Sequence, residues 1–244
     1  MRLILLTNDD GVYESGLHRL VKTAKEFGEV WIVAPDRERS ASSHSITLHT
    51  AIDVYPHDFP VPGVRAFICG GTPGDCVRVG CLHVLPRKPD VVIAGINYGY
   101  NAATDLQYSG TAGAAFEGAF QGCRAIAVSE GAHPRHEVTD AYLRDVLAEL
   151  IDEAPDVGRI WNVNFPSCAL SDCRGILRDR TVSRGTFYRD SYRLREMLPD
   201  GGRRLMVEGE YNEDAEEGTD LRAIADGYVS VGRVYNVGGP GGIV

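Results

Sequence analysis

Two adjacent carboxylates follow the first apolar segment of the chain. Residues 3–7 read Leu-Ile-Leu-Leu-Thr, and Asn8, Asp9, Asp10 and Gly11 come directly after them. Adjacent carboxylates repel each other, and a divalent cation relieves that repulsion, so this pair suits Mg²⁺, Mn²⁺ or Ca²⁺. The same four residues also fit a simple turn with Asp10 and Gly11 at its corner. The pattern alone leaves both interpretations open.

A second polar loop precedes a predicted helix of small residues. Asn97 and Asn101 lie in this loop, and Ser109, Gly110 and Thr111 stand where the helix begins. A helix N-terminus presents unpaired N–H groups and a positive dipole end, which together bind anions such as phosphate. The alternative interpretation is that Ser109 simply caps the helix.

A third polar segment, residues 36–45, contains Ser40 and His44. A single histidine is more commonly structural than catalytic, and the sequence has no Gly-x-Ser-x-Gly elbow of a serine hydrolase. It has no Gly-x-x-x-x-Gly-Lys-Ser/Thr either, which excludes a P-loop NTPase. No Gly-x-Gly-x-x-Gly follows the first apolar segment, which argues against a nicotinamide-binding domain.

The segments between these loops alternate between strand and helix patterns. Continuous apolar runs predict strands at residues 3–7, 29–34, 90–96, 125–129 and 160–164. Apolar residues at helical spacing predict helices at residues 16–27, from 72 onward, at 111–121 and at 139–154. This alternation predicts an α/β fold with a doubly wound, mainly parallel sheet.

Particular residues are expected to mark the ends of these helices. Ser15 is expected to cap the first helix, and Gly28 to close it in the left-handed conformation. Thr72 is expected to cap the second helix, with Pro73 at its first position. Gly122 is expected to close the third helix.

The three polar loops all follow predicted strands. In open parallel sheets, ligands bind beyond the carboxyl ends of the strands, so we expect the three loops to converge there. A dicarboxylate metal site that faces an anion-binding helix terminus makes a phosphate-handling centre. The metal polarises phosphoryl oxygens and lowers the pKa of a bound water.

The composition changes after about residue 167, where Arg, Asp, Gly and Tyr dominate and the pattern predicts strands and turns rather than helices. We therefore expect an α/β catalytic core at residues 1–166 and a β-rich C-terminal extension at 167–244, which completes the same domain and contributes to oligomerisation. The glycine-rich tail at residues 238–242 is expected to be mobile.

Composition limits the class of protein. The chain has 244 residues, a formal net charge of -9 and a hydrophobic fraction of 43%. An acidic chain is a poor coat for nucleic acid, so no nucleic-acid partner is expected. The first apolar run is too short for a signal peptide or a membrane span, so a cytoplasmic location is expected. The six cysteines lack metal-ligand spacing and are expected to be reduced thiols, with a bridge between Cys168 and Cys173 left open.

Nine motifs in order give the chain a family resemblance. They are residues 5–11 (LLTNDDG), 34–40 (APDRERS), 44–47 (HSIT), 71–77 (GTPGDCV), 95–101 (GINYGYN), 108–111 (YSGT), 162–166 (NVNFP), 217–220 (EGTD) and 227–231 (GYVSV). Together they resemble the SurE family of survival-protein 5′/3′-nucleotidases over nearly the whole chain.

The resemblance implies a metal-dependent phosphatase of nucleoside 5′- and 3′-monophosphates, with a Rossmann-like, three-layer core. It implies a homodimer or homotetramer in which the C-terminal extension is exchanged between subunits. The family's ligands of one divalent cation fall on Asp9, Asp10, Ser40 and Asn97. Its phosphate-binding residues fall on Asn101, Ser109, Gly110 and Thr111. Asp9 is also our candidate for orienting or deprotonating an attacking metal-bound water.

The chain departs from the family pattern at two positions. The family has Gly where this chain has Ala103, and Gly where it has Ser43, and Ser would be strained at a position with positive φ.

Two other functions also fit these residues. The first alternative function is a catalytically silent nucleotide-binding regulatory module. The second is an enzyme that transfers a sugar from a nucleotide and uses the Asp pair for its metal.

Overall fold

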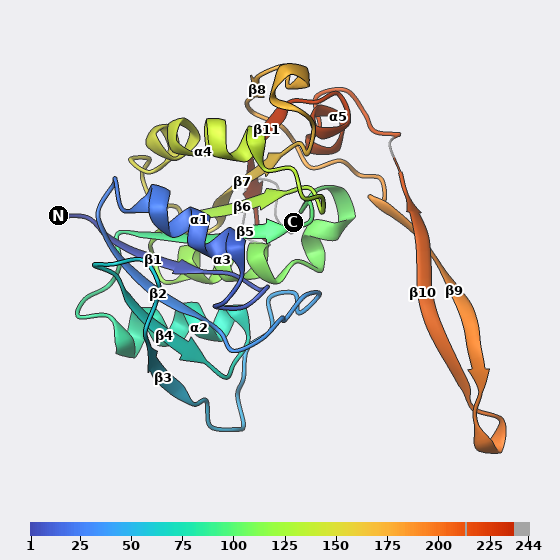
Figure 1. Cartoon of the computed structure of the whole chain (residues 1–244), viewed down its shortest axis with the longest axis horizontal. Helices are drawn as coiled ribbons and strands as arrows, with labels where there is room; N and C mark the ends of the chain where they lie inside the picture. The colour runs from blue at the N-terminus through green and yellow to red at the C-terminus, as the bar shows by residue number, and fades with distance from the viewer. Residues whose placement is uncertain (213, 237–244) are drawn as a thin grey trace, which may run out of the picture.

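A nine-stranded sheet forms the centre of the molecule (Figure 1). The computed structural model describes residues 1–212 and 214–236. The strand order across the sheet is β3-β4-β2-β1-β5-β6-β7-β11-β8. These strands are β1 (Leu3–Thr7), β2 (Glu29–Pro35), β3 (Val54–His57), β4 (Arg65–Cys69), β5 (Val91–Tyr98), β6 (Arg124–Glu130), β7 (Arg159–Phe165), β8 (Ile176–Leu177) and β11 (Val229–Tyr235). The run from β4 to β7 is parallel throughout, which confirms the predicted sheet.

Helices cover both faces of this sheet. The helices α1 (Ser15–Ala24) and α4 (Glu137–Leu150) pack on one face, and α2 (Pro73–Val79) and α3 (Gly110–Phe120) pack on the other (Figure 1). Alternate residues of β1 contribute to opposite cores, because successive side chains of a strand point to opposite faces. Both faces are therefore buried, which explains the continuous apolar strands and confirms the three layers.

The structure confirms two of the predicted helix-end residues and differs from the prediction at two others. Thr72 caps α2 in a reciprocal capping box with Asp75, and Gly122 has a φ of 76°, as predicted. The residue at the N-cap of α1 is Glu14 rather than Ser15, and its side chain makes no capping hydrogen bond. Gly28 is not left-handed; a Cβ there would lie 2.4 Å from the carbonyl oxygen of Arg2, so close packing explains this glycine.

Short helical segments complete the chain. They are the π-helical segment η1 (Gly80–Val84) and the 3₁₀ segments η2 (Ala103–Gln107), η3 (Leu170–Asp172) and η4 (Pro199–Gly201).

The C-terminal part is β-rich, as predicted, but it contains one helix. The strands β9 (Tyr188–Met197) and β10 (Arg203–Tyr211) form an antiparallel hairpin that stands away from the body (Figure 1). The helix α5 (Asp220–Ala225) follows, so the expectation of strands and turns alone was wrong there. The strand β11 then returns to the central sheet and pairs antiparallel with β7. The tail at residues 238–242 lies outside the described residues.

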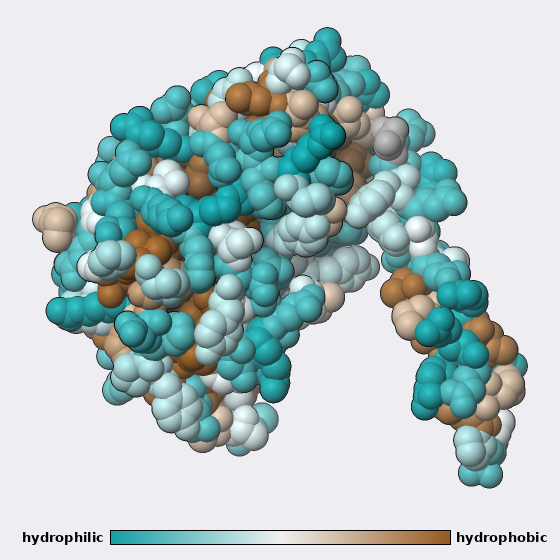
Figure 2. Space-filling model, viewed as in Figure 1, coloured by the Kyte–Doolittle hydropathy of each residue, from teal (hydrophilic) through white to brown (hydrophobic). Residues whose placement is uncertain are grey.

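One face of the hairpin is apolar. Tyr192 lies opposite Val207, and Leu194 lies opposite Leu205 in the register of the two strands. Residues two apart on a strand share a face, so these four side chains lie together. They are between 49% and 70% exposed, and Figure 2 shows apolar residues along the hairpin.

All six cysteines are free thiols, as expected, and Cys168 and Cys173 form no bridge. None of the described helices has the length and the apolar character that crossing a membrane requires.

Candidate functional site

The candidate site lies where the order of the parallel strands reverses. The strand β1 pairs with β2 on one side and with β5 on the other, and the helices α1 and α3 that follow β1 and β5 cover opposite faces of the sheet. A crevice lined by Asp10, Ser40 and Tyr98 lies at this point. Asp9 and Asp10 lie in the loop that follows β1, and Asn97 is the second-last residue of β5. Ser40 comes from the loop that follows β2. Ligands of open parallel sheets bind at such a switch point.

Asp9 is buried against the first turn of α3. Its side chain is 3% exposed, and its Oδ1 accepts a hydrogen bond of 2.5 Å from the hydroxyl of Thr111. A Cβ at Gly110 would lie 2.9 Å from Asp9 Oδ2, so only glycine allows this approach of the helix. Burial raises the pKa of Asp9, although the Thr111 hydroxyl opposes that rise.

Asp10 lies at the edge of the crevice and is partly buried. Its Oδ2 accepts a hydrogen bond of 3.2 Å from the backbone N–H of Tyr98. Burial, followed by the neighbouring Asp9 carboxylate, raises the pKa of Asp10 from 3.8 to about 7. Both carboxylates are therefore destabilised as anions, and a bound cation would relieve this.

Ser40 and Asn97 offer neutral oxygens near Asp10, since Ser40 lines its pocket and Asn97 directly precedes Tyr98, whose N–H binds Asp10. Ser40 and Asp10 line one pocket of about 370 Å³, and the Ser40 hydroxyl donates a hydrogen bond of 2.8 Å to Glu38. The Asn97 Nδ2 donates a hydrogen bond of 2.7 Å to the carbonyl of Gly99, which fixes the amide. Its Oδ1 accepts no hydrogen bond from the part of the chain that the structure describes.

These donors fit a hard divalent cation. Carboxylate, hydroxyl and amide oxygens are the ligands that Mg²⁺, Mn²⁺ and Ca²⁺ take in proteins. Within residues 1–212 and 214–236, no group of three or more His, Cys, Asp or Glu side chains could hold a metal ion. A cation in the crevice would therefore rest on two carboxylates and neutral oxygens.

The hydroxyls of Ser109 and Thr111, at the start of α3, form hydrogen bonds with other groups of the protein. Ser109 Oγ accepts a hydrogen bond of 2.9 Å from the backbone N–H of Ala112, so Ser109 caps the helix, as its alternative interpretation held. Thr111 is fully buried, and its hydroxyl donates to Asp9. The residue that fixes the orientation of Asp9 is thus one that the sequence had indicated for phosphate binding.

Ser42 is a residue that the sequence analysis did not single out. Its Oγ is buried and has no hydrogen-bond partner among the described residues. A Cβ at Gly110 would lie 2.7 Å from this Oγ and 2.9 Å from Asp9 Oδ2, so the Ser42 hydroxyl lies close to the Asp9 carboxylate. Its position among the serines of residues 40–45 was the available signal, but those serines look alike in the sequence.

Asn101 is held by polar residues of β6 and β7. Its backbone N–H donates to Asn164 Oδ1 at 2.9 Å, and its carbonyl accepts from Asn162 Nδ2 at 2.8 Å. Its side-chain Nδ2 donates to Ser129 Oγ at 2.7 Å. Asn101 is 5% exposed and is not hydrogen-bonded to Asp9 or to any other predicted site residue in the described structure.

Both departures from the family pattern fall at left-handed positions. Ser43 has a φ of 54° and Ala103 a φ of 51°. Side chains other than glycine are strained there, as the sequence predicted for Ser43. Two hydrogen bonds hold Ser43 in place, from its N–H to the Tyr108 carbonyl (2.9 Å) and from its Oγ to the Gln107 carbonyl (2.7 Å). These bonds join the loop after β2 to the loop after β5.

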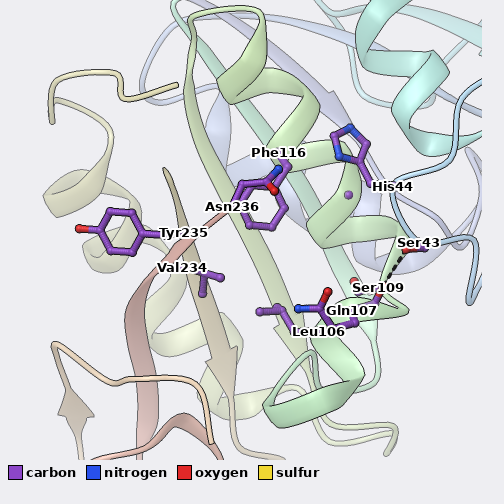
Figure 3. A pocket seen from close by; sticks show the side chains of 10 residues that line it. Ser43, His44, Leu106, Gln107, Ser109, Phe116, Val234, Tyr235 and Asn236 are labelled. Carbon is purple, nitrogen blue, oxygen red and sulfur yellow. Dashed lines mark hydrogen bonds between the residues drawn. The ribbon is translucent and has the colours of Figure 1, made fainter. Parts of the chain in front are cut away.

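His44 contacts the buried Glu117 of α3 and does not line the pocket of Asp10. Its Nε2 lies 3.0 Å from Glu117 Oε2, and Arg78 and Gln121 also bond to the buried Glu117 carboxylate. His44 lines a second pocket, of about 320 Å³, which opens beside Ser109. Figure 3 shows His44 from the loop after β2, Phe116 from α3 and Val234 from β11 around it.

Comparisons with known proteins agree on one family. The family described as Survival protein SurE matches residues 4–186. A 5'-nucleotidase SurE of Cytophaga hutchinsonii is 38% identical over 235 residues, which cover 94% of this chain and 89% of that protein. A 5'/3'-nucleotidase SurE of Erwinia tasmaniensis is 38% identical over 234 residues, 95% of this chain and 89% of that protein.

A solved structure has the same fold. The crystal structure of a SurE protein from Aquifex aeolicus superposes with a TM-score of 0.79 at 33% identity, over 96% of this chain and 93% of the other. The likeness includes both the sheet and the C-terminal part, because nearly the whole of each chain is covered.

Proposed function

This chain belongs to the SurE family, and we propose that it is a divalent-metal-dependent phosphomonoesterase of nucleotides. Its proposed substrates are nucleoside 5′-monophosphates and 3′-monophosphates, which it would hydrolyse to nucleoside and phosphate. The observation that carries the proposal is the buried Asp9 carboxylate against the N-terminus of α3, with the partly buried Asp10 next to it. The names of the relatives from Cytophaga hutchinsonii and Erwinia tasmaniensis support the class of substrate.

We propose that Asp9, Asp10, Ser40 and Asn97 hold one divalent cation in each subunit. The oxygen ligands suit Mg²⁺ or Mn²⁺, with Ca²⁺ as an alternative. Such a cation polarises phosphoryl oxygens and lowers the pKa of a water that it binds. The raised pKa values of both carboxylates support a site in which a positive charge is expected.

Asp9 is the proposed catalytic residue. The hydrogen bond from Thr111 fixes the orientation of its carboxylate, which would orient the attacking water and accept a proton from it. Asn101, Ser109, Gly110 and Thr111 are the proposed phosphate-binding residues, through the start of α3 and the loop before it. The unpartnered hydroxyl of Ser42 beside Gly110 is a further hydrogen-bond donor for the phosphate.

The apolar face of the hairpin supports an oligomer. A two-stranded hairpin is marginally stable alone, and an exposed apolar face is stabilised when another surface covers it. We propose that a second copy of this chain covers it, in a homodimer or a homotetramer with exchanged C-terminal segments. The six free thiols support action in a reducing compartment such as the cytoplasm.

The test is phosphate release from nucleoside 5′- and 3′-monophosphates with Mn²⁺, with Mg²⁺ and after EDTA. Release that depends on the metal is the expected result. Nucleotide binding without release, from protein that circular dichroism shows to be folded, would instead favour the regulatory module. Release from a nucleotide sugar of a nucleoside diphosphate, with none from monophosphates, would favour sugar transfer.

A further inference from the structure

The pocket that contains Asp10 is larger than a phosphate group needs. It measures about 370 Å³, which is in the range of sites for small organic molecules. Asp10 and Ser40 lie on its wall, and Tyr13 and Tyr98 line it as well. The pocket beside Ser109 contains neither Asp10 nor Ser40, so it is less directly connected to the proposed metal ligands.

The rest of the pocket wall is strongly acidic. Its other charged residues are Glu14, Asp36, Arg37 and Glu38. Together with Asp10 they give four carboxylates against one guanidinium, which itself lies 3.9 Å from Asp36. A phosphate dianion is therefore repelled everywhere except where a cation screens it. The part of a substrate that fills the remaining space must be uncharged.

Packing in a hydrophobic core does not explain the position of either tyrosine. Tyr98 is 53% exposed and Tyr13 is 63% exposed, so neither ring belongs to a core. Neither phenol hydroxyl makes a hydrogen bond with residues 1–212 or 214–236. The Tyr13 ring packs edge-to-face with His57, at 5.3 Å between centroids, which helps to fix its place.

Tyr98 is tied to the proposed metal end of the pocket through its backbone. Its N–H donates to Asp10 Oδ2 at 3.2 Å, so the ring begins within a few ångströms of that carboxylate. Tyr98 is also the last residue of β5 and follows Asn97 directly, so the sheet holds its backbone. An aromatic ring so close to a phosphate-handling centre is suited to stack on the base of a nucleotide.

We propose that this pocket is the nucleoside subsite, in which Tyr98 stacks on the base and Tyr13 borders it. This assignment rests on the proposed function and adds that the aromatic base itself is recognised. Stacking tolerates every base, because each has an aromatic face. The enzyme would therefore prefer nucleotides to phosphate esters without a ring, and would discriminate weakly among bases.

The test compares a nucleoside 5′-monophosphate with ribose 5-phosphate, the same ester without its base. For Tyr98→Ala we expect the KM for the nucleotide to rise by about 10-fold, with kcat nearly unchanged, because one stacking contact is lost. The values for ribose 5-phosphate should change by less than about twofold. Tyr98→Trp should restore the nucleotide KM, and Tyr13→Ala should show the same pattern as Tyr98→Ala with a smaller effect.

Tyr108→Ala is the matched control. Tyr108 is 61% exposed in the loop after β5 but does not line this pocket, so both KM values should stay as in the wild type. Equal losses for nucleotide and ribose 5-phosphate in Tyr98→Ala would overturn the proposal, because Tyr98 would then act on the phosphate end. An unchanged nucleotide KM would overturn it too.

A binding measurement separates this proposal from the proposed function. Calorimetry with a nucleoside that carries no phosphate, such as adenosine, reads the subsite without catalysis. Weaker adenosine binding by about 10-fold in Tyr98→Ala supports the subsite, even if the wild type releases no phosphate from any ester. Equal adenosine binding by both proteins, or none by the wild type, counts against it.

Discussion

The crevice beside β1 and the β9–β10 hairpin differ in how far contacts within one chain stabilise their side chains. In the crevice, loops distant in sequence meet within the chain, and Thr111 and the Tyr98 backbone stabilise Asp9 and Asp10. The hairpin stands away from the body and leaves the apolar side chains of both strands exposed (Figure 2). One chain therefore brings together the residues of the proposed chemistry, whereas the apolar face of the hairpin is covered only in the proposed oligomer.

The largest effect should come from removing one carboxylate of the crevice. Asp10→Asn keeps the shape of the side chain but removes its charge, so metal-dependent phosphate release should fall by about 1,000-fold. Mn²⁺ should also raise the melting temperature of the wild type but not that of the variant. Phosphate assays and thermal melts measure both effects.

A distant carboxylate provides the control for that change. Asp53→Asn alters an exposed residue that does not line the pocket of Asp10, so activity and the response to Mn²⁺ should both be kept. Full activity in Asp10→Asn would show that the site has been assigned to the wrong residues.

A smaller effect on activity should follow from removing the hydrogen bond that Thr111 donates to Asp9. Thr111→Val has nearly the same shape but lacks the hydroxyl that donates to Asp9, so kcat should fall by about 10- to 100-fold, and Thr111→Ser should recover most of it. Thr139→Val is the matched control, because Thr139 is a buried threonine that donates to the Glu130 carboxylate at 2.6 Å. Thr139→Val should reduce the stability of the protein and leave kcat unchanged. If Thr111→Val had the same kcat as the wild type, Thr111 would not orient Asp9 for catalysis.

Stability without metal should depend on pH through Asp10. In the folded protein this carboxyl keeps its proton up to about pH 7, whereas its ordinary pKa is 3.8. The folded state therefore binds the extra proton between these values, and the free energy of unfolding falls as the pH rises through them. In EDTA, the wild type should lose on the order of 2 kcal/mol relative to Asp10→Asn between pH 5 and pH 8.

Urea denaturation at the two pH values measures this difference. Adding Mn²⁺ at pH 8 should restore the stability of the wild type, since the cation neutralises both carboxylates. A constant difference between the two proteins in EDTA would mean that Asp10 is ionised in the folded state at pH 5.

The smallest effect on activity should come from the hairpin. Leu194→Lys places a charge on its apolar face, so light scattering should report a smaller oligomer, while kcat changes by less than about twofold. Ser191→Lys introduces the same side chain on the opposite face of β9 and should keep the oligomer. Unchanged mass in Leu194→Lys would show that this face does not bind a second copy.

Most elements of the fold could be predicted because their signals are local. The strand at residues 3–7 and the capping box at Thr72 follow from neighbouring residues alone. The return of β11 to the side of β7 could not be predicted, because strand pairing depends on residues far apart in the chain. The short helix α5 was missed because it lies in a segment rich in polar and turn residues.

The candidate site shows the same division. By itself, the sequence determined that two carboxylates end the first strand and that a helix begins at Gly110. Only the tertiary structure decided that Thr111 bonds to Asp9, 102 residues away, and that Asn101 is held by Asn164 rather than by the crevice. Sequence patterns record what each segment prefers, whereas the partners of a buried polar group are set by how the segments pack together.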